Sequence, residues 1–230
     1  MAKPQLKTLT QLFRESYQAV KRNLSLFVFV NVVTILGTAW NIGLDIRDKT
    51  HGSDWGQVLG HGFTGSGDYP HVHGGLSVFF ILVGLILGLI GVFLSFKAAQ
   101  RKVVSFDEVW EIFKAKWWKV ILVEIIIILF ILGGLVALVL PGLYLIARLS
   151  LAPYVAIDQD GDVTDAIRKS WEMSKNHAWT IFVTVFFGLV LSLPSFIPVV
   201  GKLISLILVI AYSVALPIRY FELKNLKEDG

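Results

Sequence analysis

The chain has no cysteine among its 230 residues, and only 17% of its residues are charged. The absence of cysteine excludes disulfide bonds, thiolate zinc sites, iron–sulfur ligation and cysteine nucleophiles. The sequence also lacks a phosphate-binding glycine loop, an HExxH motif and a Ser/His/Asp set, so it carries no motif of an enzyme. Although the sequence pI is near 9.2, the basic residues form no single patch and no nucleic-acid-binding motif is present. We expect no enzymatic activity, no cofactor and no nucleic-acid partner.

Long apolar runs are abundant instead. Hydrophobic residues make up 55% of the chain and the mean hydropathy is +0.68, values typical of membrane proteins with several transmembrane helices. Two apolar runs, Ile121–Leu140 and Leu143–Ile157, occupy the centre of the chain and are hinged on Pro141 and Gly142. A helix of about 20 residues is about 30 Å long, which matches the hydrocarbon thickness of a bilayer. This hairpin predicts a membrane protein.

Four further apolar runs bring the predicted number of transmembrane helices to six. They are Leu24–Leu44, Leu76–Ala99, Ala178–Leu193 and Leu203–Phe221. Pro194 and Pro198 separate the last two runs and favour a turn over one kinked helix, while Pro217 is expected to bend the final helix locally. We therefore predict an all-α polytopic fold, with residues 1–230 forming a single membrane domain.

The distribution of basic residues predicts the orientation. Seventeen of the 21 lysines and arginines fall in the N-terminal segment, in residues 97–119, in residues 158–177 or in the C-terminal segment, which six helices place on one side. The other side holds only Arg47, Lys49 and Lys202. Because short loops rich in lysine and arginine stay in the cytoplasm, both termini are predicted to be cytoplasmic, in the plasma (inner) membrane.

Three polar segments show amphipathic helical patterns that begin in a similar way. Each opens with a side chain that can cap a helix, followed three residues later by one that can bond back: Thr8 with Gln11, Ser105 with Glu108, and Asp162 with Asp165. Asp165 is short for the return bond, so the third cap is a variant. The patterns predict cytoplasmic interfacial helices whose apolar faces lie in the acyl boundary.

Each interfacial helix precedes a predicted transmembrane hairpin. This order predicts three parallel units related by an axis near the membrane normal, with chance similarity between amphipathic helices as the alternative. The units are residues 8–99, 105–157 and 162–222.

The second half of the chain resembles a known family. The stretch Pro141-Gly142-x5-Arg148-x4-Pro153, followed by Asp158 and by Ala166-x3-Ser170-Trp171, is similar to the membrane domain attached to some glycerophosphodiester phosphodiesterases. That domain also occurs as a stand-alone bacterial and archaeal protein. The ending Arg219-Tyr220-Phe221-Glu222-Leu223 resembles the Tyr-rich, charged ending of the family, whereas the first hairpin is similar only in architecture. These residues contain no soluble phosphodiesterase barrel, so the resemblance implies a membrane fold and no hydrolase activity.

Arg148 and Glu124 are charged residues inside the two central apolar runs. Counting residues along straight helices places both in the cytoplasmic half of the bilayer, where a charge is costly unless it is paired. Three interpretations remain open. The two side chains form a buried ion pair, or each snorkels to the inner headgroups, or Arg148 contacts a substrate or a lipid phosphate.

The predicted outer loop, residues 45–75, contains eight glycines and most of the histidines. Imidazole groups could bind zinc or copper there, and the candidate ligands are His51, His61, His71 and His73. Because so many glycines would make such a site floppy, a solvated flexible loop is the stronger interpretation, and no metal is expected.

A stripe of small residues marks the second predicted span. Gly84, Gly88, Gly91 and Ser95 recur on one side of the helix and leave it smooth. Another backbone can approach such a surface closely, so we expect tight helix packing there.

The favoured function is that of a non-enzymatic integral membrane protein, either a scaffold or a lipid and membrane-homeostasis factor. Membrane lipids and other membrane proteins are its expected partners. One alternative is a small transporter or channel with a polar site around Arg148 and Glu124, and another is a membrane accessory subunit of a lipid-metabolising enzyme. Other polar residues in the spans are few, which favours the first function; they are Asn31, Asn41, Ser192, Ser205 and Ser213.

Overall fold

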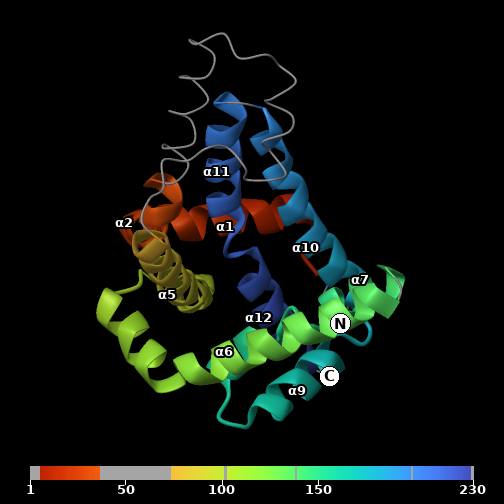
Figure 1. The fold of residues 1–230 in the computed structure, drawn as a ribbon. Helices are drawn as coiled ribbons and strands as arrows, with labels where there is room; N and C mark the ends of the chain where they lie inside the picture. The colour runs from red at the N-terminus through yellow and green to blue at the C-terminus, as the bar shows by residue number, and fades with distance from the viewer. Residues whose placement is uncertain (1–5, 37–73, 101–102, 138, 198, 229–230) are drawn as a thin grey trace.

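The computed structural model of the chain describes residues 6–36, 74–100, 103–137, 139–197 and 199–228, and all regular structure within them is helical (Figure 1). Four stretches are long and apolar enough to cross a membrane: Leu82–Ala99, Phe106–Gly134, Ala178–Phe196 and Val200–Leu226. The chain is therefore a helical membrane protein. Of the two other predicted spans, residues 24–44 lie partly outside the described residues and residues 143–157 divide into two short helices.

In chain order the described helices are α1 (Leu9–Arg22), α2 (Leu24–Val30), α5 (Gly74–Ala99), α6 (Phe106–Ala137), α7 (Val139–Leu149), α8 (Ala152–Asp158), α9 (Val163–Ser174), α10 (Ala178–Ser192), the 3-10 helix η1 (Leu193–Phe196), α11 (Val200–Tyr212) and α12 (Ala215–Glu228).

Two of the predicted caps start helices in the expected way. At α1, the hydroxyl of Thr8 accepts a 3.4 Å bond from the N–H of Gln11, whose side-chain oxygen accepts a 3.0 Å bond from the N–H of Thr8. At α9, a carboxylate oxygen of Asp165 accepts a 3.2 Å bond from the N–H of Asp162. The expectation that Asp165 is too short for the return bond is therefore wrong.

The predicted amphipathic helix after Ser105 is not separate from the span that follows it. Ser105 caps through a 3.3 Å bond from the N–H of Asp107, and the described residues show no return bond from Glu108. Helix α6 then continues unbroken for 32 residues, about 48 Å. Its first turns carry a ladder of stacked rings, with centroids 6.1 Å apart for Phe106 and Trp110.

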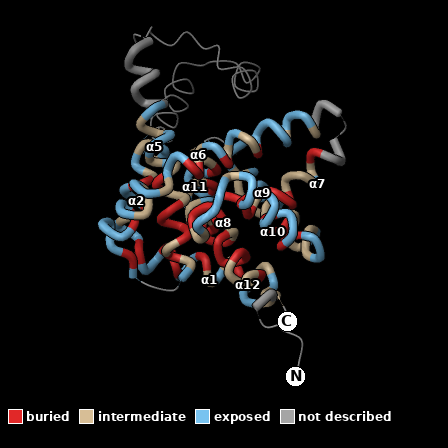
Figure 2. The backbone as a smooth tube through the Cα atoms, turned by 90° about the horizontal axis from the view of Figure 1, so that it is seen from below, coloured by how far each residue is buried: buried red, intermediate tan, exposed pale blue. Residues whose placement is uncertain are grey.

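Prolines break two of the predicted spans. A proline ring clashes with the carbonyl four residues earlier and offers no N–H to the helix. Helix α7 ends at Leu149, four residues before Pro153, and α11 ends five residues before Pro217, which confirms the bend predicted there. After the first break, every residue from Ala152 to Ile157 of α8 is buried, and Figure 2 shows α8 within the buried part of the molecule.

The connection between α10 and α11 is the turn predicted from Pro194 and Pro198. Helix η1 reverses the chain, and Val199 adopts a positive φ of 62°. A Cβ atom on Gly201 would lie 1.9 Å from the carbonyl oxygen of Pro194, so only glycine fits at this position.

Helices α1 and α9 bury their apolar faces against the protein itself. Helix α1 packs across α11 and α12, as Figure 1 shows for α11, while α9 packs on α7 and α8. The buried side chains are Leu12, Ser16, Ala19 and Val20 of α1, and Ala166, Ser170, Met173 and Ser174 of α9. The expectation that these faces lie in the acyl boundary is therefore wrong, because the protein's own spans cover them.

Exposed apolar side chains lie on the long helices. Leu85 of α5, Ile128 of α6, Leu189 of α10 and Ile207 of α11 are each more than half exposed. An apolar surface of this extent is unfavourable in water and suits the acyl chains of a bilayer.

Candidate functional site

Arg148 lies in an aromatic enclosure near the end of α7. Its side chain is almost wholly buried, and its Nε donates a 2.8 Å hydrogen bond to the hydroxyl of Tyr144, which also accepts from Nη2. Its Nη1 donates a 3.1 Å bond to the carbonyl of Trp171 in α9. The guanidinium carbon lies 4.9 Å from the ring centroid of Tyr144 and 5.0 Å from that of Trp171, so cation–π attraction adds to the hydrogen bonds.

Glu124 takes no part in this enclosure. The described residues contain no ion pair between Arg148 and Glu124, so the pairing offered as one interpretation does not form. The break after α7 explains the difference, because counting along a straight helix takes no account of the turn that brings Arg148 beside Trp171 of α9. Two aromatic rings and a backbone carbonyl satisfy the cation there.

The backbone of Arg148 is held by the same helix. In an unbroken helix its carbonyl would accept from the N–H four residues later, in α8. The hydroxyl of Ser170 donates a 2.7 Å bond to this carbonyl instead, and that of Ser174 donates a 3.4 Å bond. Helix α9 therefore binds both the side chain and the backbone of Arg148 at the helix break.

A matching contact holds the other broken span. The hydroxyl of Ser16 in α1 donates a 2.7 Å bond to the carbonyl of Ala211 and accepts a 3.1 Å bond from the N–H of Val214. Ala211 belongs to the last turn of α11, and Val214 lies in the break before α12. Ser16 follows Thr8 by eight residues, and Ser170 follows Asp162 by the same number, so the two contacts occupy equivalent positions in α1 and α9.

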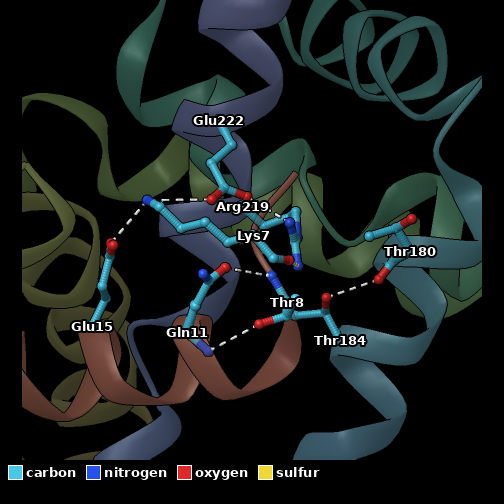
Figure 3. A network of polar contacts seen from close by, with 8 residues as sticks. All are labelled: Lys7, Thr8, Gln11, Glu15, Thr180, Thr184, Arg219 and Glu222. Carbon is cyan, nitrogen blue, oxygen red and sulfur yellow. Dashed lines mark hydrogen bonds and ion pairs between the residues drawn. The ribbon is translucent and has the colours of Figure 1, made fainter. Parts of the chain in front are cut away.

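A network of charges joins the beginning of the described chain to α12 (Figure 3). The ammonium group of Lys7 lies 2.8 Å from a carboxylate oxygen of Glu15 and 3.2 Å from one of Glu222. The other carboxylate oxygen of Glu222 accepts a 2.5 Å bond from Arg219, whose Nη2 donates to the carbonyl of Lys7 at 3.1 Å. The side chain of Arg219 is 1% exposed and that of Glu222 is 12% exposed, so this pair forms a buried clamp, while Lys7 and Glu15 lie at its partly exposed edge.

Asp158 connects the end of α8 to α12. One of its carboxylate oxygens accepts a 2.7 Å bond from the hydroxyl of Tyr220 and a 2.6 Å bond from Lys224. Two residues later, Asp160 lies 2.9 Å from the ammonium group of Lys116. The hydrogen bond and the charge of Lys116 lower the pKa of the Asp160 carboxyl below its usual value.

Two hollows are of a size to hold a ligand. One of about 440 Å³ opens between α6 and α9 and is lined by side chains of both signs, which select neither an anion nor a cation; they include Lys119, Arg168, Lys169, Asp160, Asp165 and Glu172. The second, of about 280 Å³, lies between α2, residues 33 and 34, and α5, with Tyr154 and Ser213 completing its lining. Neither hollow is lined by Arg148 or Glu124.

The remaining predicted positions divide between described and undescribed residues. The boundary between α6 and α7 falls between Ala137 and Val139, so Pro141 and Gly142 belong to the first turn of α7. A Cβ on Gly134 would lie 3.0 Å from the Cα of Gly142, which shows how closely the two helices approach.

The candidate metal ligands His51, His61, His71 and His73 lie outside the described residues. Within the described part of the chain, no group of three or more histidine, aspartate or glutamate side chains could hold a metal ion.

The comparisons add no family or relative. No family model, no curated protein and no solved structure matches the chain significantly. The resemblance to the membrane domain of some glycerophosphodiester phosphodiesterases therefore stays a prediction.

Sequence reasoning missed the buried clamp. Arg219 stands near the C-terminus in a charged stretch that is typical of exposed residues, and Lys7 is more than 200 positions away from it. The sequence around Arg219 contained one sign of a buried ion pair. Arg219 follows Pro217 within an apolar helix and precedes Glu222 by one helical turn.

Proposed function

We propose that the chain is a non-enzymatic integral membrane protein of the plasma membrane that binds anionic phospholipid in the cytoplasmic leaflet, as a scaffold or lipid-homeostasis factor. Both termini lie in the cytoplasm in this proposal. The basic outer side of α1 is the observation that carries it.

Helix α1 exposes only basic charges. Arg14, Lys21 and Arg22 are exposed, and their spacing of seven and eight residues places them on one side of the helix. Glu15, the only acidic residue of α1, forms an ion pair with Lys7. Because the opposite side of α1 is buried against α11 and α12, the basic side is free to meet anionic headgroups.

This basic side adjoins an apolar surface. Helix α2 begins two residues after Arg22 and exposes Leu24, Val28 and Phe29, which suit acyl chains. A headgroup bound to Arg22 would therefore belong to a lipid whose chains lie along α2. A juxtamembrane basic residue contributes about 1 kcal/mol near an anionic surface.

We also propose that the chain forms six spans in three units around an axis near the membrane normal. Equivalent contacts support this arrangement. Ser16 and Ser170, each eight residues after its cap, bond to the breaks in α11–α12 and α7–α8. Phe113, eight residues after Ser105, packs edge-to-face on Phe93 of α5 with the centroids 5.7 Å apart. The first helix of each unit thus contacts the last helix of the preceding unit, with α1 closing the ring.

The test is a thermal unfolding series in nanodiscs. Wild type is expected to unfold at a higher temperature in discs that contain about one third phosphatidylglycerol than in phosphatidylcholine discs, because anionic headgroups bind the folded state. Neutralising α1 by Arg14→Gln, Lys21→Gln and Arg22→Gln should remove most of this difference. High salt should reduce it in wild type, since the Debye length falls to about 3 Å at 1 M.

The matched control exchanges the same three residues without changing charge, as Arg14→Lys, Lys21→Arg and Arg22→Lys. This variant should keep the preference of wild type. Equal unfolding temperatures of wild type in both kinds of disc would contradict the proposal, as would a full preference in the neutralised variant.

A further inference from the structure

The hollow beside α5 lies where the glycine stripe is not filled by a neighbour. At Gly91 a Cβ would lie 3.1 Å from Val30, and at Gly84 it would lie 3.9 Å from Val33, so the neighbouring segment packs against both glycines. At Gly88, between them, a Cβ would meet nothing within 4 Å. The expected tight packing therefore occurs at Gly91, whereas the contact at Gly84 is an ordinary van der Waals contact and a hollow of about 280 Å³ lies at Gly88.

Two buried residues, Tyr154 and Ser95, line this hollow with their hydroxyl groups. Tyr154 is 9% exposed and Ser95 is 6% exposed, and within the described residues neither hydroxyl makes a hydrogen bond. Asn31, also in the lining, donates to the carbonyl of Phe27 while its side-chain oxygen accepts nothing from the described residues. A molecule that enters the hollow can therefore form hydrogen bonds with these groups.

Ser95 and Tyr154 lie toward the end of the hollow near the polar segments, and most of the remaining lining is apolar, with Asn31 and Thr34 as further polar residues. Ser95 precedes Lys97, in the last turn of α5, by two residues, and Tyr154 precedes Asp158 by one turn. Gly84 lies eleven residues before Ser95, about 16 Å deeper along α5. Hydroxyl groups just below the basic cytoplasmic edge, with a mostly apolar groove beneath them, match the ester group and acyl chain of a glycerophospholipid.

The groove is open to the lipid side of the molecule. Gly88 is exposed, and its neighbours Leu85 and Ile86 are exposed apolar side chains. A chain from the surrounding bilayer can therefore enter sideways without a conformational change.

We propose that this groove holds one acyl chain of a cytoplasmic-leaflet glycerophospholipid, and that the hydroxyls of Tyr154 and Ser95 donate to its ester carbonyl. The inference rests on the proposed lipid-binding function and adds the site and the chemical group that is recognised. Unlike the basic side of α1, this site recognises the ester region and is indifferent to the headgroup.

The test is photocrosslinking of the full chain in nanodiscs with a phospholipid that carries a diazirine on one acyl chain, used with either a choline or a glycerol headgroup. Both probes are expected to label Leu87 and Val92 of the groove, as mapped by peptide mass spectrometry. Gly88→Leu, which fills the groove, should reduce this labelling to background. Gly133→Leu is the matched control, because Gly133 is an exposed helical glycine whose Cβ would also meet nothing within 4 Å.

A second variant removes the donors and keeps the shape. Tyr154→Phe combined with Ser95→Ala should raise the probe concentration for half-maximal labelling about fivefold, the effect of one or two net hydrogen bonds. This variant decides the question if Gly88→Leu does not fold. Unchanged labelling in Gly88→Leu, or an unchanged half-maximal concentration in the double variant, would overturn the inference.

The chain has no cysteine, so Gly88→Cys gives a single thiol that tests for water in the groove. Rapid labelling by a membrane-impermeant thiol reagent would show an aqueous path, overturn the lipid assignment and favour transport. The experiments distinguish a failure of the headgroup proposal for α1 from a failure of the acyl-chain proposal for the groove. Groove labelling without a phosphatidylglycerol effect on unfolding contradicts only the headgroup proposal, and the reverse result contradicts only the acyl-chain site.

Discussion

The hydroxyl of Ser170 donates a 2.7 Å hydrogen bond to the backbone carbonyl of Arg148, across the point where a proline interrupts the span. Ser16 makes the equivalent bond to the carbonyl of Ala211 at the other interrupted span. In both cases a short polar side chain on an amphipathic helix replaces a helical hydrogen bond that the proline-induced break removes. The two breaks are thus fixed elements of the fold.

Removing either hydroxyl should destabilise the protein. We expect Ser170→Ala and Ser16→Ala to lower the free energy of unfolding by about 1–2 kcal/mol each, because a buried carbonyl loses a donor inside a membrane protein. The measurement is unfolding in mixed micelles. Ser192→Ala is the control, since its hydroxyl bonds only to the carbonyl of Leu189 in its own helix, and it should change stability by less than about 0.5 kcal/mol.

Arg148 should couple to Tyr144 and not to Glu124. Arg148→Lys loses the planar contacts with both rings, and we expect it to cost about 1.5–3 kcal/mol. In double-mutant cycles, Arg148→Lys with Tyr144→Phe should be non-additive, whereas Arg148→Lys with Glu124→Gln should be additive within about 0.5 kcal/mol. A large coupling free energy between Arg148 and Glu124 would contradict this prediction and would show that the two residues form an ion pair.

Removing one partner of the clamp between Arg219 and Glu222 should destabilise the protein more than half as much as expected from removing both, because the remaining partner keeps an uncompensated buried charge. Arg219→Met leaves the carboxylate of Glu222 with Lys7 alone, and Glu222→Gln leaves the buried guanidinium without an anionic partner, so each should cost about 3–5 kcal/mol. The double variant should cost clearly less than the sum, as measured by unfolding in detergent. Additive losses would show that the two residues stabilise the protein independently.

Gly201 should not tolerate a methyl group. Gly201→Ala places a Cβ against the carbonyl oxygen of Pro194, and we expect a loss of at least about 2 kcal/mol with a disturbed α10–α11 turn. Gly188→Ala serves as the control, because its Cβ would make ordinary contacts of 3.5 and 3.6 Å with Tyr212. This control should be neutral, or stabilising by up to about 1 kcal/mol from helix propensity. Equal effects of the two substitutions would contradict the packing at the turn.

The sequence predicted local features well because they depend on neighbouring residues. The cap at Thr8 and the bend before Pro217 follow from backbone hydrogen bonding within one or two helical turns, and both are present. The prediction for the third cap was wrong, since the return bond between Asp165 and the N–H of Asp162 does form. It depends on the backbone position of Asp165, which the residue type alone does not specify.

The partners of the charged residues were harder to predict because they depend on distant segments. Glu124 was the nearest residue of opposite charge in the hairpin, whereas the break after Leu149 brings Arg148 to Trp171. Likewise, the apolar stripe of α1 fits a bilayer surface as well as a protein surface. Only the positions of α11 and α12 show that the protein covers it.

Orientation is the claim on which both proposals depend, and single cysteines in this cysteine-free chain test it most directly. Tyr17→Cys on α1 and Lys169→Cys on α9 replace exposed residues, as does Ser195→Cys in the α10–α11 turn; Gly67→Cys lies in the predicted outer loop. A membrane-impermeant thiol reagent applied to intact cells should label Cys variants at Gly67 and Ser195, and should label those at Tyr17 and Lys169 only in inverted vesicles. Labelling of the Tyr17 or Lys169 variants in intact cells would place α1 or α9 outside and contradict binding to the cytoplasmic leaflet.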